Sequence, residues 1–165
     1  MALQLRYAAR SDVGLVREGN EDSGYAGPSL LMVADGMGGH AAGELASAIA
    51  VATVADLDVH PPRDQEILTS LGEAIGEVGD GIADVIDAEP EYTGMGTTVT
   101  GLYWMADRVA VVHVGDSRAY LLRDGHLTQI THDHTYVQTL IDAGRITEDE
   151  AAVHPRRSLI MRALD

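Results

Sequence analysis

An aspartate follows an apolar run that is typical of a buried strand, at the start of a glycine-rich segment. Ser29 to Ala34 is apolar and leads into Asp35 to His40, with the sequence DGMGGH. Glycines let a backbone approach a ligand closely, and the leading aspartate favours a cation over a phosphate. A simple strand-to-helix turn uses the same residue types, so this segment alone leaves both interpretations open.

Two further segments carry residues with the same chemistry. Arg17 stands four residues before the carboxylate pair Glu21 and Asp22, and Asp116 follows the apolar run Val109 to Val114. A guanidinium suits phosphate, which it can bind through two parallel hydrogen bonds, and carboxylates suit a hard divalent cation. Taken singly, the first segment is more simply a solvated polar loop and the second a β-turn.

The run His132-Asp133-His134 also has metal-binding residue types. Adjacent residues of an extended chain face opposite ways, so three in a row rarely bind one ion. We therefore predict a structural or capping role for Asp133.

Hydrophobic periodicity predicts the elements that must position these residues. Alternation at Leu3, Leu5 and Tyr7 indicates an N-terminal strand, and steps of three and four indicate helices over 38–57 and 67–85. Four short strands are expected over 97–104, 109–114, 118–122 and 127–130. The turn at Asp124-Gly125 predicts a hairpin between the last two. Helical patterns follow: one after His134, closed by Gly144, and one opened by a capping box over 147–150. Because no βαβ alternation appears, the sheets should be antiparallel and the fold class α+β.

Composition limits the class of protein. The 165 residues are 45% hydrophobic and 22% charged, which indicates a single globular domain over residues 1–165. A net charge of -15 makes nucleic acid a poor partner, and the absence of cysteine excludes thiolate catalysis and cysteine zinc sites. No apolar run reaches membrane-spanning length, so we expect a soluble cytoplasmic protein.

In combination, these segments resemble the metal-dependent protein phosphatases (the PPM family, type 2C serine/threonine phosphatases) in their bacterial form. The similarity runs from about Leu5 to Leu164 and is strongest to phosphatases that oppose serine/threonine kinases in actinobacteria. The matching segments are, in chain order, Arg17 with Glu21-Asp22, Val33 to His40 (VADGMGGH), Gly94 to Thr98 (GMGTT), Gly115 to Tyr120 (GDSRAY), Thr131 to Thr135 (THDHT) and Arg157 to Leu164 (RSLIMRAL).

The resemblance implies an antiparallel β-sandwich with a helix pair outside each sheet. It also implies two catalytic Mn²⁺ or Mg²⁺ ions, with a third, weaker ion in bacterial members. Carried over, Asp35 bridges the two ions and the Gly36 carbonyl binds one of them. Glu21 and Asp22 hold metal-bound water, and Asp116 helps to form the third site.

Two catalytic roles and one flap segment follow from the same resemblance. Arg17 would bind the phosphate, and His40 would be the general acid that protonates the leaving oxygen. The segment over 135–156 would be the flap beside the active site. Phosphorylated proteins and serine/threonine kinases are the implied partners.

The family pattern continues beyond Leu164 with two more metal-binding aspartates, and neither segment is in this sequence. We therefore expect a fragment that lacks the C-terminal part of the fold and that binds metal weakly by itself. The leading hypothesis is a serine/threonine phosphoprotein phosphatase that uses a metal-activated water. The alternative is a non-catalytic phosphoprotein-binding or regulatory module, and a purely structural acidic domain is a weaker third.

Overall fold

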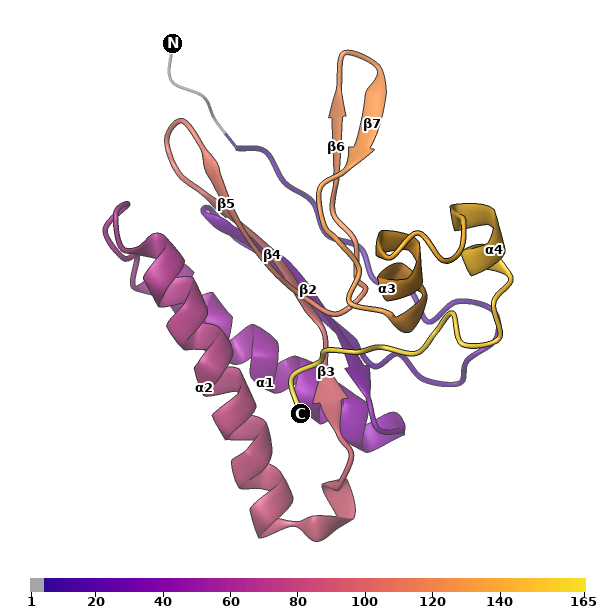
Figure 1. The fold of residues 1–165 in the computed structure, drawn as a ribbon. Helices are drawn as coiled ribbons and strands as arrows, with labels where there is room; N and C mark the ends of the chain where they lie inside the picture. Colours follow the sequence, from indigo (N-terminus) through magenta and orange to yellow (C-terminus); the bar gives the residue numbers. More distant parts are fainter. Residues whose placement is uncertain (1–4) are drawn as a thin grey trace.

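The computed structural model describes residues 5–165, and its main feature is one antiparallel sheet (Figure 1). The strands lie in the order β1-β2-β4-β5, and β3 also pairs with β2 beyond the end of β4. Their bounds are β1 Asp22–Ala26, β2 Leu30–Met37, β3 Gly96–Thr97, β4 Val99–Trp104 and β5 Val109–Val114.

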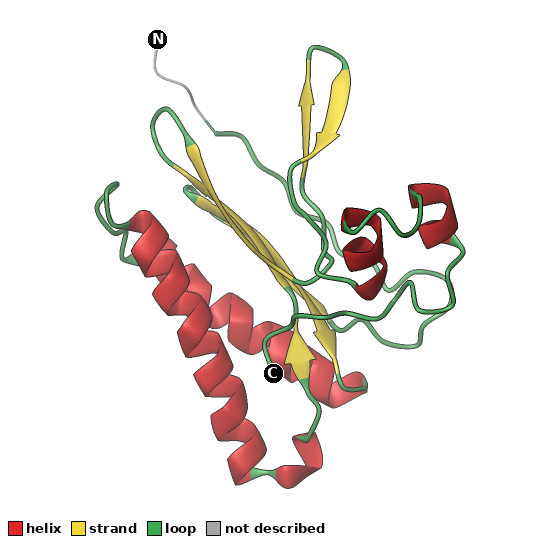
Figure 2. Cartoon of the chain, viewed as in Figure 1, coloured by secondary structure: helices red, strands yellow, loops and turns green. Residues whose placement is uncertain are grey.

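Two long helices cover one face of this sheet (Figure 2). They are α1 (His40–Val59) and α2 (Ile67–Ala88), and a short 3-10 turn, η1 (Pro90–Tyr92), leads from α2 back to the sheet. In α2 the buried side chains recur at steps of three and four, whereas α1 buries mainly alanines, which let it approach the sheet closely. No helix among residues 5–165 has both the length and the apolar character needed to cross a membrane.

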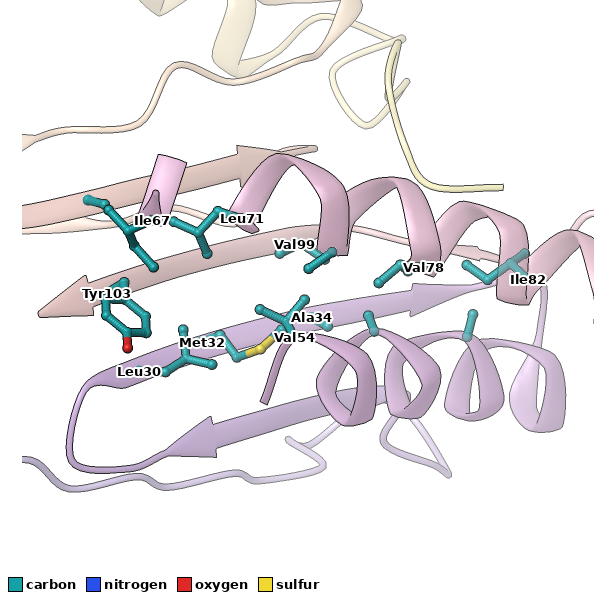
Figure 3. Packing of buried hydrophobic residues seen from close by; sticks show 14 of the residues in the cluster. Leu30, Met32, Ala34, Val54, Ile67, Leu71, Val78, Ile82, Val99 and Tyr103 are labelled. Atoms are coloured by element: carbon teal, nitrogen blue, oxygen red, sulfur yellow. The ribbon is translucent and has the colours of Figure 1, made fainter. Parts of the chain in front are cut away.

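The hydrophobic core lies between the sheet and the two helices (Figure 3). Leu30, Met32 and Ala34 alternate along β2 and point into this core, where they meet Val54 of α1 and Val78 of α2. The intervening residues of β2 face the other way, as the period of two in a strand requires. Asp35 is therefore on the sheet face that the helices leave uncovered.

The rest of the chain lies beyond that uncovered face (Figure 1). The strands β6 (Tyr120–Arg123) and β7 (His126–Gln129) form a separate hairpin, in which Asp124 and Gly125 both have positive φ, 51° and 78°. This is the two-residue turn that the Asp-Gly pair predicts. Two short helices follow, α3 (Tyr136–Asp142) and α4 (Glu148–Ala152), and Thr147 and Glu150 form the predicted capping box.

The α+β class with antiparallel pairing is confirmed. Residues 5–165 contain one five-stranded sheet with its helix pair and, separate from it, the two-stranded β6–β7 hairpin. The predicted N-terminal strand is wrong for Leu5 to Tyr7, because the described residues give this segment no partner strand; Leu3 lies outside the described residues. Asp35 is also not in a loop, since pairing with β3 extends β2 to Met37.

Candidate functional site

Asp22 and Asp35 form a directly opposed pair on β1 and β2. Opposed residues of an antiparallel pair point to the same face of a sheet, so both carboxylates stand on the face away from α1 and α2. Like charges in this arrangement are destabilising by themselves. The pair therefore favours either a bound proton or a cation.

The pKa of Asp35 shows which other groups are near. It is raised to about 6, first by partial loss of hydration and then by the negative charges of Asp22 and Asp116. The positive charge of Arg17 acts in the opposite direction and lowers this pKa. Side chains from the N-terminal segment, β1 and the turn after β5 thus act electrostatically on Asp35 in β2.

Glu21 is fixed mainly through its backbone. Its carbonyl accepts a hydrogen bond from the Gly36 N–H at 3.2 Å and another from the Ser47 hydroxyl at 2.7 Å. The Glu21 carboxylate lies against Gly43 in α1, where a Cβ on Gly43 would be 2.0 Å from Oε2. Its carboxylate is therefore on the α1 side, opposite to the face of Asp35.

Asp116 occupies a tight turn directly after β5. Gly115 precedes it with a φ of 107°, a conformation that favours glycine, and a Cβ there would collide with the side chain of Thr98. The Gly115 N–H donates to Nδ1 of His134 at 3.1 Å, and the ring of His134 stacks on that of His113. This turn is thus fixed from two sides.

The structure gives fewer contacts for the two predicted catalytic residues, Arg17 and His40. Arg17 is exposed, in keeping with a side chain that is free to meet a ligand from solvent. His40 is the first residue of α1, and its side chain lies outside the described part of the structure.

Asp133 has the structural role that its position predicts. Its buried carboxylate accepts hydrogen bonds from Arg118 and from Gln129. Burial, the nearby His113 and Arg162 lower the pKa of His134, whose Nδ1 serves as an acceptor. The side chains of Asp133 and His134 therefore make hydrogen bonds that connect segments of the fold.

The oxygen donors of Asp22, Asp35 and Asp116, which we call the carboxylate rim, provide part of a site for a divalent cation. Oxygen ligands are what Mn²⁺ and Mg²⁺ prefer, and a cation would offset the repulsion that raises the pKa of Asp35. Within residues 5–165, however, no three His, Asp or Glu side chains converge closely enough to hold a metal ion. The described residues provide a partial set of ligands.

A cavity of about 680 Å³ extends from this rim along the uncovered face of the sheet. The N-terminal segment over 8–12 forms one wall, and Leu31, Val33 and Leu102 line the apolar floor. Asp22 and Asp35 lie among its lining residues, so the carboxylate rim is open to molecules from solvent.

Sequence reasoning did not identify three residues that connect this rim, namely Thr98, Ser117 and His113. The only signal for Thr98 was its place in the Gly94 to Thr98 segment. Its contact with Ser117 joins the residue between β3 and β4 to the turn after β5, and it is visible only in the fold.

Comparison with known proteins gives a consistent picture. A family model described as Protein phosphatase 2C matches residues 20–159. The chain is 57% identical over 164 residues to serine/threonine protein phosphatase PstP of Mycobacterium tuberculosis H37Rv, covering 99% of this chain and 32% of that protein. It is 38% identical over 163 residues to the serine/threonine phosphatase stp of Listeria monocytogenes EGD-e, covering 94% of this chain and 65% of that protein.

Solved structures agree. The crystal structure of M. tuberculosis PstP/Ppp superimposes with a TM-score of 0.93 at 58% identity, over 98% of this chain and 68% of that one. The catalytic domain of PstP in complex with two manganese ions gives a TM-score of 0.88 at 55% identity, over 96% of this chain and 66% of that one. The chain thus spans about a third of PstP and about two thirds of these crystallised domains.

Proposed function

The chain belongs to the protein phosphatase 2C family, and we propose that it contributes to metal-dependent hydrolysis of phosphoserine and phosphothreonine in proteins. The observation that carries the proposal is the opposed Asp22–Asp35 pair on the uncovered face of the sheet, where the charges of Asp116 and Arg17 also act on Asp35. The manganese complex of the PstP catalytic domain supports the choice of metal. Because the chain spans only part of its relatives, the activity is proposed for the protein that carries it.

In this proposal Asp35, Asp22, Asp116 and the Gly36 carbonyl would hold Mn²⁺ or Mg²⁺. The Glu21 carboxylate lies against Gly43 on the α1 side and is not part of this set. The metal ions supply Lewis-acid charge that activates water near neutral pH and neutralises the phosphoryl oxygens. The opposed carboxylates provide the negative field that attracts the cations to the open rim. Phosphorylated proteins, serine/threonine kinases among them, are the proposed substrates in the cytoplasm.

Arg17 and His40 divide the remaining work. The guanidinium of Arg17 would orient the phosphate through paired hydrogen bonds. Its positive charge would favour a phosphate that the net charge of -15 otherwise repels. His40 would donate a proton to the oxygen of the leaving serine or threonine, since an alkoxide is a poor leaving group.

The test of the proposal is Asp35→Asn assayed with a phosphothreonine peptide and Mn²⁺. Loss of turnover together with loss of Mn²⁺ binding supports the proposal, and unchanged turnover refutes it. His40→Ala is assayed in parallel with p-nitrophenyl phosphate, whose leaving group needs no proton. A general acid predicts a larger loss with the peptide, whereas an equal loss with both substrates indicates a structural role.

The partial set of ligands favours a second candidate, a phosphoprotein-binding module without turnover. In that case Arg17 would still bind phosphate. A chelator separates the two functions. It should abolish turnover by a phosphatase, whereas a non-catalytic module should bind the phosphopeptide equally well with and without the chelator.

A further inference from the structure

The backbone ladder changes its acceptor at Asp35. β2 pairs with β3 and β4 in one continuous register, which puts Asp35 opposite Thr98. The Thr98 N–H donates to the Asp35 carbonyl at 2.9 Å, as in a regular antiparallel pair. In return, the Asp35 N–H donates to Oγ1 of Thr98 at 3.0 Å. A side-chain hydroxyl thus takes a place that a carbonyl usually has.

The same side chain contacts both neighbours of Asp116. Oγ1 of Thr98 lies 2.9 Å from Oγ of Ser117, and the Thr98 methyl group fills the space beside Gly115. A Cβ added to Gly115 would be 2.5 Å from Cγ2 of Thr98. Thr98 is 0% exposed, so these contacts are made without competition from water.

The hydroxyl of Thr98 has one hydrogen and two lone pairs. One lone pair accepts the Asp35 N–H, and the remaining capacity is shared with Ser117. Ser117 is held from its other side by Thr100, whose hydroxyl donates to the Ser117 carbonyl at 2.8 Å. A valine at position 98 would fill the same volume, so the hydroxyl provides direction that packing alone does not.

We propose that Thr98 is a positioning residue that fixes Asp35 relative to Asp116 through its hydroxyl group. Asp35 lies in β2 and Asp116 in the turn after β5, and Thr98 is a buried side chain that contacts the segments carrying both. This inference rests on the proposed function, in which both carboxylates serve one metal centre. Partners of metal ligands typically change metal affinity by about 10–100-fold when they are removed.

The test compares three variants of the protein. Thr98→Val removes the hydroxyl and keeps the shape, Thr98→Ser keeps the hydroxyl, and Thr131→Val is the matched control. Thr131 is also buried and its Oγ1 also accepts a backbone N–H, from Ala119 at 3.1 Å, away from Asp35. Calorimetric titration with Mn²⁺ should show about tenfold weaker binding for Thr98→Val. Thr98→Ser and Thr131→Val should bind like the wild type.

Amide hydrogen exchange without metal gives a second readout. The Asp35 N–H should exchange about fivefold faster in Thr98→Val than in the wild type, because a typical hydrogen bond contributes about 1 kcal/mol. Thr98→Ser should restore slow exchange. If Thr98→Val does not fold, Ser117→Ala is used instead, and it should weaken Mn²⁺ binding while leaving the Asp35 N–H protected.

The outcomes separate this inference from the proposed function. Wild-type affinity for Mn²⁺ in Thr98→Val, or in Ser117→Ala where that variant replaces it, overturns the positioning role. If the wild type itself binds no Mn²⁺, the proposed function fails. Amide exchange at Asp35 then tests the positioning role of Thr98 by itself. Unchanged exchange at Asp35 in Thr98→Val also overturns the positioning role.

Discussion

Arg118 donates hydrogen bonds from Nε and Nη2 to the carboxylate of Asp133, whose side chain is only 5% exposed. The pair joins the turn after β5 to the segment that precedes α3. It raises the pKa of the Arg118 guanidinium and keeps it charged. The elements around the candidate site are thus tied together by a largely buried carboxylate.

Arg118→Met should destabilise the protein by about 2–3 kcal/mol, because it leaves Asp133 charged, buried and without its cation. Urea unfolding at pH 7 measures this loss. Arg63→Met is the control, since the Arg63–Glu66 pair is 74% and 43% exposed and should contribute less than about 1 kcal/mol. Equal losses in the two variants would contradict a special role for the buried pair.

Asp35 predicts a dependence of stability on pH. Because its pKa is raised to about 6 from 3.8, the native state holds this proton more tightly than the unfolded state does. The resulting stability is present below pH 4 and is lost as the pH rises through 6. Without metal, Asp35→Asn should therefore stabilise the protein at pH 7 by about 1 kcal/mol, a value discounted for solvent screening.

Thermal unfolding at pH 3.5 and pH 7, in the presence of a chelator, measures this effect. The two proteins should unfold at the same temperature at the lower pH, where Asp35 is protonated in both states. Asp84→Asn, at an exposed position of α2, controls for the change in net charge. A gain at pH 7 that Asp84→Asn reproduces would show that net charge, and not the crowding at Asp35, is responsible.

Replacing glycine by alanine should change the stability of the protein in opposite directions at Gly36 and Gly72. Gly36→Ala would place a Cβ 2.0 Å from the Gly43 carbonyl oxygen, so β2 and α1 must separate, at a cost of about 3 kcal/mol. Gly72→Ala in α2 meets no atom within 4 Å and should stabilise the helix by about 0.5–1 kcal/mol. Chemical denaturation of both variants provides the comparison, and a tolerated alanine at position 36 would refute the close packing.

Arg17→Ala should raise KM for a phosphopeptide by at least about tenfold, because a charge-assisted hydrogen bond to the phosphate is lost. Its effect on kcat should be smaller. Steady-state kinetics with Mn²⁺ measures both constants, and Arg123→Ala on β6 controls for the loss of one exposed positive charge. Unchanged KM in Arg17→Ala would assign Arg17 another role, such as balancing the carboxylates.

Sequence patterns predicted the helices and turns that depend on residues close together in the chain. The steps of three and four from Ile67 mark α2, and the Asp-Gly pair marks the β6–β7 turn, because both patterns depend on neighbouring residues. The extension of β2 through Asp35 to Met37 depends on β3, which lies far along the chain. The predicted strand at Leu5 to Tyr7 failed for the same reason, since alternation does not provide a partner.

The candidate site divides in the same way. Residue types and order predicted Asp35, Asp22, Asp116 and Arg17 as site residues, and in the structure the charges of the other three act on Asp35. Their roles toward a metal and a phosphate stay predictions. Sequence could not show that Glu21 turns toward Gly43 in α1, because that depends on packing between a strand and a helix. Nor could it show the hydroxyl contact between Thr98 and Ser117.

The pairing of Thr97 with Leu164 has a consequence for the order of folding. Its two hydrogen bonds, at 2.8 and 2.9 Å, join β3 to a segment far along the chain. Contacts between residues so distant in sequence cost more loop-closure entropy than the β1–β2 hairpin does. The rim that holds Asp35 should therefore close late on the ribosome, after α1 and α2 have docked, and a stalled nascent chain that ends before Leu164 should leave β3 unpaired on that side.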